Sequence, residues 1–209
     1  MKLKSKKVKQ CLLCKNKKLR QIFSLGNLFV SNFVNKKDIN NGIRAPLKLL
    51  YCQNCELIQL SHIAPQQVIY KRFYWYRSGI TKTMNLALQN IFKESLKYVK
   101  LNVNDVVLDI GANDGTLLKF YKKKGIKTIG CEPAKNLQNN LKRNCDHTLN
   151  DFWSKEKLNK VLLKNRLKKP KIITAIGMFY DLENPNKFII IVGELGAGDG
   201  TTGIGPDPS

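Results

Sequence analysis

Residues 81–178 alternate between short apolar runs and amphipathic segments, and this alternation restricts the possible fold more than any other feature of the sequence. Apolar runs are typical of buried strands, whereas apolar residues at three- and four-residue spacing are typical of helices that pack on a sheet. Alternating strands and helices form βαβ units, so the pattern predicts a parallel sheet covered by helices, an α/β fold. The predicted strands are VVLDI (106–110), IKTIGC (126–131), residues 146–149 and KIITAIGM (171–178). The predicted helices are 81–99, 116–123, 133–143 and 154–166, and the first would bury Met84, Leu88, Ile91, Phe92, Leu96 and Val99.

The first predicted strand-to-helix turn, DIGANDG, combines acidic residues, an amide and two glycines. In an open parallel sheet a ligand binds beyond the carboxyl ends of the strands, against such a turn. Gly111 and Gly115 would let the backbone approach a ligand, while Asp109 and Asn113 would supply polar atoms beside it. Glu132 ends the next predicted strand, where a carboxylate can accept hydrogen bonds from both hydroxyls of a ribose. The pattern indicates a ligand that contains a nucleoside. A tight turn without a ligand is the alternative, because the full GxGxxG of dinucleotide sites is absent.

Four of the six cysteines form two CxxC pairs, Cys11 with Cys14 and Cys52 with Cys55. Each pair can chelate a metal ion through a tight turn, and four thiolates complete the tetrahedral shell that zinc prefers. Four protein ligands leave no open position, so the zinc would be structural. Disulfides are the alternative, but nothing in the sequence points to an oxidising compartment. The segments RQIFSLG, LKLLYC and ELIQLS predict short strands around the metal, and hence a small zinc-ribbon-like β module.

The formal net charge of +22 raises the question of a nucleic-acid partner, because clustered Lys and Arg bind phosphate backbones. Lysine far outnumbers arginine, however, and the basic residues are spread along the chain without interleaved aromatic residues. We therefore attribute the charge to composition and expect no nucleic-acid partner. No segment reaches the roughly 18 apolar residues of a membrane span, and no apolar segment follows the basic N-terminus. We expect a cytoplasmic protein without a membrane partner.

Six motifs resemble a known enzyme family when they are taken together. CLLC, YCQNCELIQL, YWYRSG, VLDIGANDGTLL, GCEPA and ITAIGMFYDLENPNKF occur in the order seen in S-adenosylmethionine-dependent C-methyltransferases. These enzymes methylate nucleotide-linked keto-sugars and carry an N-terminal zinc-binding domain. The resemblance covers residues 11–190 and implies a Rossmann-like methyltransferase sheet, incomplete here, after the zinc module. It also implies that DIGANDG, including Asp114, contacts the methionine end of S-adenosylmethionine. Glu132 would bind the ribose with Pro133 beside it, and YWYRSG would lie where cofactor and sugar meet.

The chemistry that this resemblance implies needs a base to remove a proton beside the keto group of the sugar. The resulting enolate then attacks the methyl group of the cofactor. The candidates for contact with the sugar are Tyr76, Ser78, Tyr180 and Asp181. Core packing is the alternative for the two tyrosines. The resemblance implies a catalytic histidine in a histidine-rich segment downstream of the fifth strand, and we expect this chain to stop before that segment. His62 and His147 are expected to be structural or exposed. Cys131 and Cys145 are expected to be buried thiols.

We expect four parts along the chain. These are a basic mobile tail (1–10), a zinc-binding module with a connector (11–80), a partial Rossmann-like domain that binds S-adenosylmethionine (81–192) and a glycine-rich disordered tail (193–209). We interpret the lysine-free tail as foreign sequence after a truncation, with a natural flexible tail as the alternative. The expected function is C-methylation of a nucleotide-linked keto-sugar, here in an inactive N-terminal fragment. A non-catalytic module that binds zinc and cofactor is one alternative. The other is an RNA methyltransferase, although MFYDLENP differs from the Asn/Asp-Pro-Pro-aromatic tetrapeptide of base-amino methylation. Nothing in the sequence indicates an oligomeric state.

Overall fold

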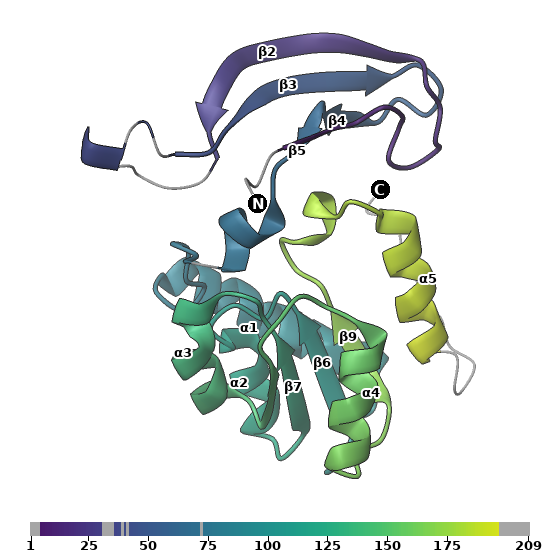
Figure 1. The fold of residues 1–209 in the computed structure, drawn as a ribbon. Helices are drawn as coiled ribbons and strands as arrows, with labels where there is room; N and C mark the ends of the chain where they lie inside the picture. The colour runs from purple at the N-terminus through teal and green to yellow at the C-terminus, as the bar shows by residue number, and fades with distance from the viewer. Residues whose placement is uncertain (1–4, 31–35, 39, 41, 72, 197–209) are drawn as a thin grey trace. The chain divides into compact units, whose positions relative to one another are not determined.

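The computed structural model describes residues 5–30, 36–38, 40, 42–71 and 73–196, and the chain divides into two compact units (Figure 1). The first unit comprises Met1–Phe73 and Leu182–Asn186, and the second comprises Tyr74–Asp181 and Lys187–Ser209. The tail predictions for residues 1–4 and 197–209 lie outside the described residues.

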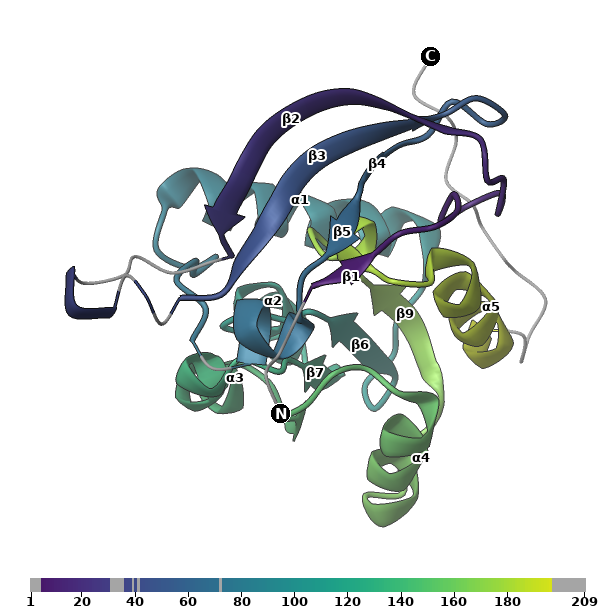
Figure 2. The ribbon, with the colours of Figure 1, turned by 45° about the horizontal axis from the view of Figure 1, so that its top comes forward.

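The first unit is built from antiparallel strands (Figures 1 and 2). One sheet has the order β2-β3-β4, and a second pairs β1 with β5. The bounds are β1 (Lys6–Lys7), β2 (Leu19–Phe29), β3 (Arg44–Cys52), β4 (Ile58–Leu60) and β5 (His62–Ile63), with short helices η1 (Lys36–Asp38) and η2 (Gln67–Lys71). The small β module is thus confirmed. Strand β2 is longer than RQIFSLG because it continues past Gly26, where a register shift against β3 and a φ of 75° accommodate a bulge.

The second unit contains a four-stranded parallel sheet, which confirms the predicted α/β fold (Figure 1). Its strands are β6 (Val106–Ile110), β7 (Lys127–Cys131), β8 (His147–Leu149) and β9 (Pro170–Thr174), in the spatial order β8-β7-β6-β9. The chain winds outward from β6 to β7 and β8, and then returns to place β9 on the other side of β6. The strand order therefore reverses at β6, and the carboxyl end of this strand is the position where ligands bind in such sheets.

The helices of this part of the chain follow the predicted alternation. They are α1 (Lys82–Tyr98), α2 (Thr116–Lys122), η3 (Lys135–Leu137), α3 (Gln138–Asn144), α4 (Lys155–Lys164), η4 (Phe179–Asp181) and α5 (Pro185–Gly196). Residues 193–196, which composition placed in the glycine-rich tail, form the end of α5. Within the described ranges, no helix combines the length and the apolar character that a membrane crossing requires.

The core of the second unit lies between the sheet and helices α1 and α2. Leu88 and Phe92 of α1 are buried there, and Phe92 meets the ring of Tyr121 edge to face at 4.8 Å. Met84 and Val99 also pack against this core, whereas Ile91 and Leu96 are exposed, so the prediction that the helix buries these two residues was wrong. Cys131 and Cys145 are buried as expected, and burial raises the pKa of each thiol to about 12.

Candidate metal centre and cofactor site

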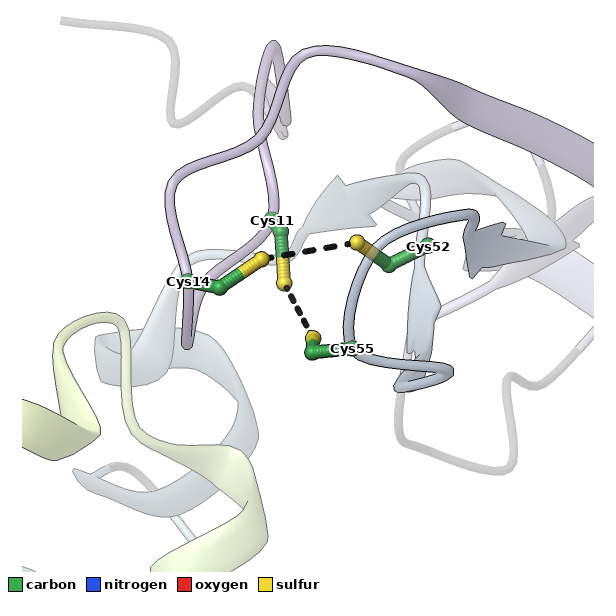
Figure 3. A group of neighbouring side chains, drawn as sticks. All are labelled: Cys11, Cys14, Cys52 and Cys55. Carbon is green, nitrogen blue, oxygen red and sulfur yellow. Dashed lines mark hydrogen bonds between the residues drawn. The ribbon is translucent and has the colours of Figure 1, made fainter.

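The four CxxC cysteines converge in the first unit (Figure 3). Cys11 and Cys14 precede β2, whereas Cys52 ends β3 and Cys55 follows it. All four Sγ atoms lie within 4.8 Å of one another; the Cys11–Cys55 pair is 3.5 Å apart and the Cys14–Cys52 pair 3.6 Å. Four Zn–S bonds of about 2.3 Å in a tetrahedron require sulfur atoms roughly 3.8 Å apart. The cluster therefore has the donor set and the dimensions of a structural zinc site.

Two turns of the same geometry present these sulfur atoms. The Lys15 amide donates to the Cys11 carbonyl at 3.1 Å, and the Glu56 amide donates to the Cys52 carbonyl at 3.0 Å. Lys15 and Glu56 have left-handed φ values of 63° and 62°, which non-glycine residues adopt rarely. Because both turns have the same uncommon conformation at equivalent positions, each directs its two thiols toward the same point.

Gln59 supports the first of these turns, although the sequence analysis did not identify it. Its side-chain oxygen accepts a hydrogen bond from the Leu12 amide at 2.8 Å, and its side-chain nitrogen donates to the Gln10 carbonyl at 3.4 Å. Gln59 is buried on β4 and thereby ties the turn that carries Cys11 to the sheet. Partners of this kind orient metal ligands.

The DIGANDG turn leaves β6 with three left-handed residues, Gly111, Asn113 and Gly115. The Gly111 and Ala112 amides donate to the Cys131 carbonyl of β7 at 2.8 and 3.0 Å, which fixes the turn against the neighbouring strand. A Cβ atom at position 115 would lie 2.9 Å from the Asn144 side chain. The turn therefore needs glycine at this position for close packing as well as for its backbone conformation.

Asp109 and Glu132 occupy the carboxyl ends of the adjacent strands β6 and β7, and their exposed fractions are only 5% and 6%. Asp109 Oδ1 accepts a hydrogen bond from the Thr174 hydroxyl at 2.7 Å. The two oxygens of Glu132 accept from the Asn113 amide at 2.9 Å and the Ala134 amide at 2.8 Å. The structure therefore brings the two predicted acids together at the strand-order reversal.

Both carboxyl groups have raised pKa values. Burial raises the pKa of Asp109 to about 7; the Thr174 hydroxyl opposes this rise, and the charge of Glu132 adds to it. Burial also raises the pKa of Glu132, against the effect of its two backbone donors. In the part of the chain that the structure describes, neither carboxylate pairs with a Lys, Arg or His side chain. Two buried acids without a cation form a site suited to a ligand with hydroxyl and cationic groups.

The YWYRSG segment lies against the DIGANDG turn. The Asn113 side chain accepts from the Ser78 amide at 3.0 Å and donates to the Tyr76 carbonyl at 3.1 Å. Asp114 accepts from the Gly79 amide at 2.9 Å. The predicted cofactor residues Asn113 and Asp114 thus use their side chains to hold the backbone of the aromatic segment, and Tyr76 keeps 45% of its surface exposed.

Asn136 holds the beginning of the same segment, and the sequence analysis did not identify it. Its side-chain oxygen accepts from the Tyr74 amide, and its side-chain nitrogen donates to the Tyr74 carbonyl, both at 2.9 Å. This reciprocal pair resembles the pairing between two strands. No sequence pattern marked Asn136, because its partner lies 62 residues away.

The remaining candidates lie near Tyr74. Burial raises the pKa of Tyr74, and the nearby Tyr180, Asp181, Glu132 and Tyr76 contribute to this rise in decreasing order. Tyr180 is 77% exposed on η4, so core packing does not account for it. The structure thus brings the predicted sugar-facing side chains of Tyr76, Tyr180 and Asp181, and the predicted ribose acid Glu132, into electrostatic range of one tyrosine, Tyr74.

Two buried polar atoms have no hydrogen-bond partner among the described residues. One is Gln138 Oε1, whose amide nitrogen donates to the Glu132 carbonyl at 2.7 Å; the other is Trp153 Nε1, in the loop after β8. Pro133 follows Glu132 and is half-buried. An unpartnered acceptor beside Glu132, together with the left-handed glycine turn and the two acids, fits a nucleoside-containing cofactor.

Comparisons with known proteins agree with this geometry. A family described as "Putative zinc binding domain" matches residues 11–70, and a family described as "Methyltransferase domain" matches residues 80–200. The C-methyltransferase NovU of Streptomyces niveus is 22% identical over 132 residues. That alignment covers 62% of this chain and 31% of the relative, so the chain spans about a third of the length of this relative. The methyltransferase-domain match covers more than half of the chain and coincides with the parallel sheet, and the chain therefore belongs to the methyltransferase-domain family, with a zinc-binding-type module before that domain.

Proposed function

We propose that this protein binds S-adenosylmethionine at the DIGANDG turn and serves the C-methylation of a nucleotide-linked keto-sugar. The observation that carries the proposal is the pair of buried acids, Asp109 and Glu132, at the carboxyl ends of adjacent strands where the strand order reverses. Glu132 would accept hydrogen bonds from the ribose hydroxyls, because a carboxylate oxygen can accept a further bond beside its backbone donor. Asp109 would face the methionine end of the cofactor.

The sugar half of the proposal rests on the residues around Tyr74 and on the relative whose name is C-methyltransferase. The cofactor supplies an electrophilic methyl group when it is bound. Residues of this chain would then orient the sugar. Tyr76 and Ser78 would contact it from the segment whose backbone is hydrogen-bonded to Asn113. Tyr180 and Asp181 would contact it from η4. Correct placement of two bound molecules is itself a large source of rate enhancement.

We further propose that this chain alone is a poor catalyst. Enolate formation needs a base beside the sugar carbon. In the described part of the chain, His62 belongs to the first unit, where its Nδ1 atom is hydrogen-bonded to the Ser61 hydroxyl at 2.8 Å. His147 begins β8. His147, the one histidine in the sequence of the second unit, thus lies at the start of a strand, whereas Glu132 follows the end of β7.

The cofactor proposal predicts the effect of Glu132→Ala. Removal of a charged hydrogen-bond acceptor should weaken S-adenosylmethionine binding by about 1.5 to 3 kcal/mol. Titration calorimetry on the 209-residue chain measures this loss. The matched control is Glu94→Ala, because Glu94 is an exposed acid of α1 that pairs with Lys97 on the same helix and should not affect binding. Equal affinity of the Glu132→Ala variant and the parent would remove Glu132 from the site, and no binding by the parent would refute the cofactor proposal.

A further inference from the structure

The register between β6 and β9 places two side-chain pairs on one face of the sheet. Val107 pairs with Ile172 and Asp109 with Thr174, and residues two apart in a strand share a face. Val107 and Ile172 belong to the core under α1 and α2. The Asp109–Thr174 pair therefore continues that face to the carboxyl end of the sheet, where a polar pair replaces the apolar one.

Thr174 gives Asp109 its hydrogen bond. The Thr174 hydroxyl oxygen lies 2.7 Å from Asp109 Oδ1 and 3.4 Å from the Leu108 carbonyl, so its single proton belongs to the carboxylate. Among the described residues, no other hydrogen-bond donor reaches the Asp109 side chain. An aspartate carboxylate with one donor in a buried position is poorly compensated when ionised.

Among the residues that the structure describes, none contributes a positive charge that acts on Asp109. The titratable groups of the described residues that interact with Asp109 are Cys131 on β7, Glu132 directly after β7, Tyr121 on α2 and Cys145 after α3. All of these are neutral or anionic at neutral pH. A cationic group of a ligand would be the first positive charge to reach this carboxylate, and it would favour the ionised form strongly.

We propose that Thr174 is a positioning residue of the cofactor site, which holds the Asp109 carboxylate in place for the ammonium group at the methionine end of the ligand. The inference rests on the proposed cofactor binding. Its proton balance is simple: a protonated Asp109 gives its proton to solvent, and the carboxylate then pairs with the incoming ammonium group. Ligand binding below the pKa of Asp109 should therefore release a proton, and binding well above that pKa should release none from this group.

Removal of the Thr174 hydroxyl should change both affinity and proton release. Thr174→Val keeps the shape of the side chain but leaves the carboxylate without its donor, which raises the pKa of Asp109 further above about 7. We expect S-adenosylhomocysteine to bind about 10- to 100-fold more weakly near neutral pH, with proton release that persists to higher pH. Thr174→Ser restores the hydroxyl and should restore both quantities.

The test uses titration calorimetry of the full chain with S-adenosylhomocysteine, at pH values of about 6 and 8.5, in buffers of different ionisation enthalpy. The control ligand is 5′-methylthioadenosine, which keeps the nucleoside but lacks the ammonium group. Its affinity should be the same for the parent and Thr174→Val. If Thr174→Val weakened the affinity for both ligands equally, the role of Thr174 would be merely structural. If the affinity for S-adenosylhomocysteine and the number of protons released were unchanged, the inference would also be overturned, although the cofactor proposal would stand. A parent that binds neither ligand would overturn the cofactor proposal together with this inference.

Discussion

Asp109 couples the stability of the unliganded protein to pH. An aspartate in an unfolded chain has a pKa near 3.9, whereas burial raises that of Asp109 to about 7 in the folded protein. Between these values the folded state binds the additional proton, so the contribution of Asp109 to the free energy of unfolding falls as the pH rises. For these two pKa values, the loss between pH 5 and pH 8 is roughly 2 to 3 kcal/mol. Asp109→Asn should remove this pH dependence in urea unfolding curves.

Asp105 is the matched control, because it lies at the other end of the same sheet region and its pKa shifts in the opposite direction. The Asn102 amide and the Lys171 ammonium group, at 2.7 and 2.9 Å, hold the pKa of Asp105 below its ordinary value. Its contribution is present above the unfolded pKa and is lost as the pH falls through the lower folded value, so Asp105→Asn should destabilise most at neutral pH. If the free energy of unfolding of the Asp109→Asn variant varied with pH as that of the parent does, the ionisation of another group would cause the pH dependence.

At the residue scale, the spacing of residues in the sequence predicted where a residue lies in the fold better than it predicted the hydrogen-bond partners of its side chain. Asp109 and Glu132 were placed at neighbouring strand ends because strand length and the βα turn fix where each strand stops. Asn113 was predicted to supply polar atoms beside a ligand, and this stays a prediction; its contact with the backbone of Tyr76 and Ser78 was not foreseen. That contact joins residues 35 or more positions apart, and no local pattern in the sequence encodes it.

At the element scale, we expect the two cysteine turns and the strands between them to depend on one metal ion. A small sheet with an exposed apolar strand such as β2 buries too little surface to be stable alone, and a zinc ion would supply the missing free energy. Cys52→Ser should therefore lose zinc and unfold the first unit, whereas the parent should hold one zinc per chain. Metal analysis and amide NMR spectra measure the two effects.

Cys145→Ala provides the control for this prediction, since Cys145 is a buried thiol outside the cluster and its loss should leave the zinc content unchanged. A parent free of zinc after purification without chelators, or a Cys52→Ser variant with the spectrum of the parent in the first unit, would contradict a structural zinc site.

Strand and helix types were predictable where burial is complete. All five residues of β6 are buried, and a continuous apolar run is what a strand covered on both faces requires. Strand β2 was predicted too short, because Gly26 and Asn27 have the composition of a turn, while pairing with β3 carries the strand through a bulge to Phe29. Pairing of this kind is a tertiary effect that local propensity does not contain.

At the scale of the whole molecule, the proposed function makes a prediction about substrate and rate. General-base catalysis commonly contributes about 10² to 10⁴ in rate, and the one histidine in the sequence of the second unit, His147, begins β8 instead of following the end of a strand. With radiolabelled S-adenosylmethionine, this chain should methylate nucleotide-linked keto-sugars only slowly, and added imidazole should raise the rate because it can replace a base. Glu132→Ala should slow the transfer further when the cofactor concentration is below saturation, since the substitution weakens cofactor binding and leaves the need for a base unchanged. Bulk RNA offered in parallel should remain unlabelled, because the basic residues are dispersed and the site is built from buried acids. Labelled RNA would overturn the proposed substrate, and rapid transfer to the sugar without imidazole would show that a base is already in place.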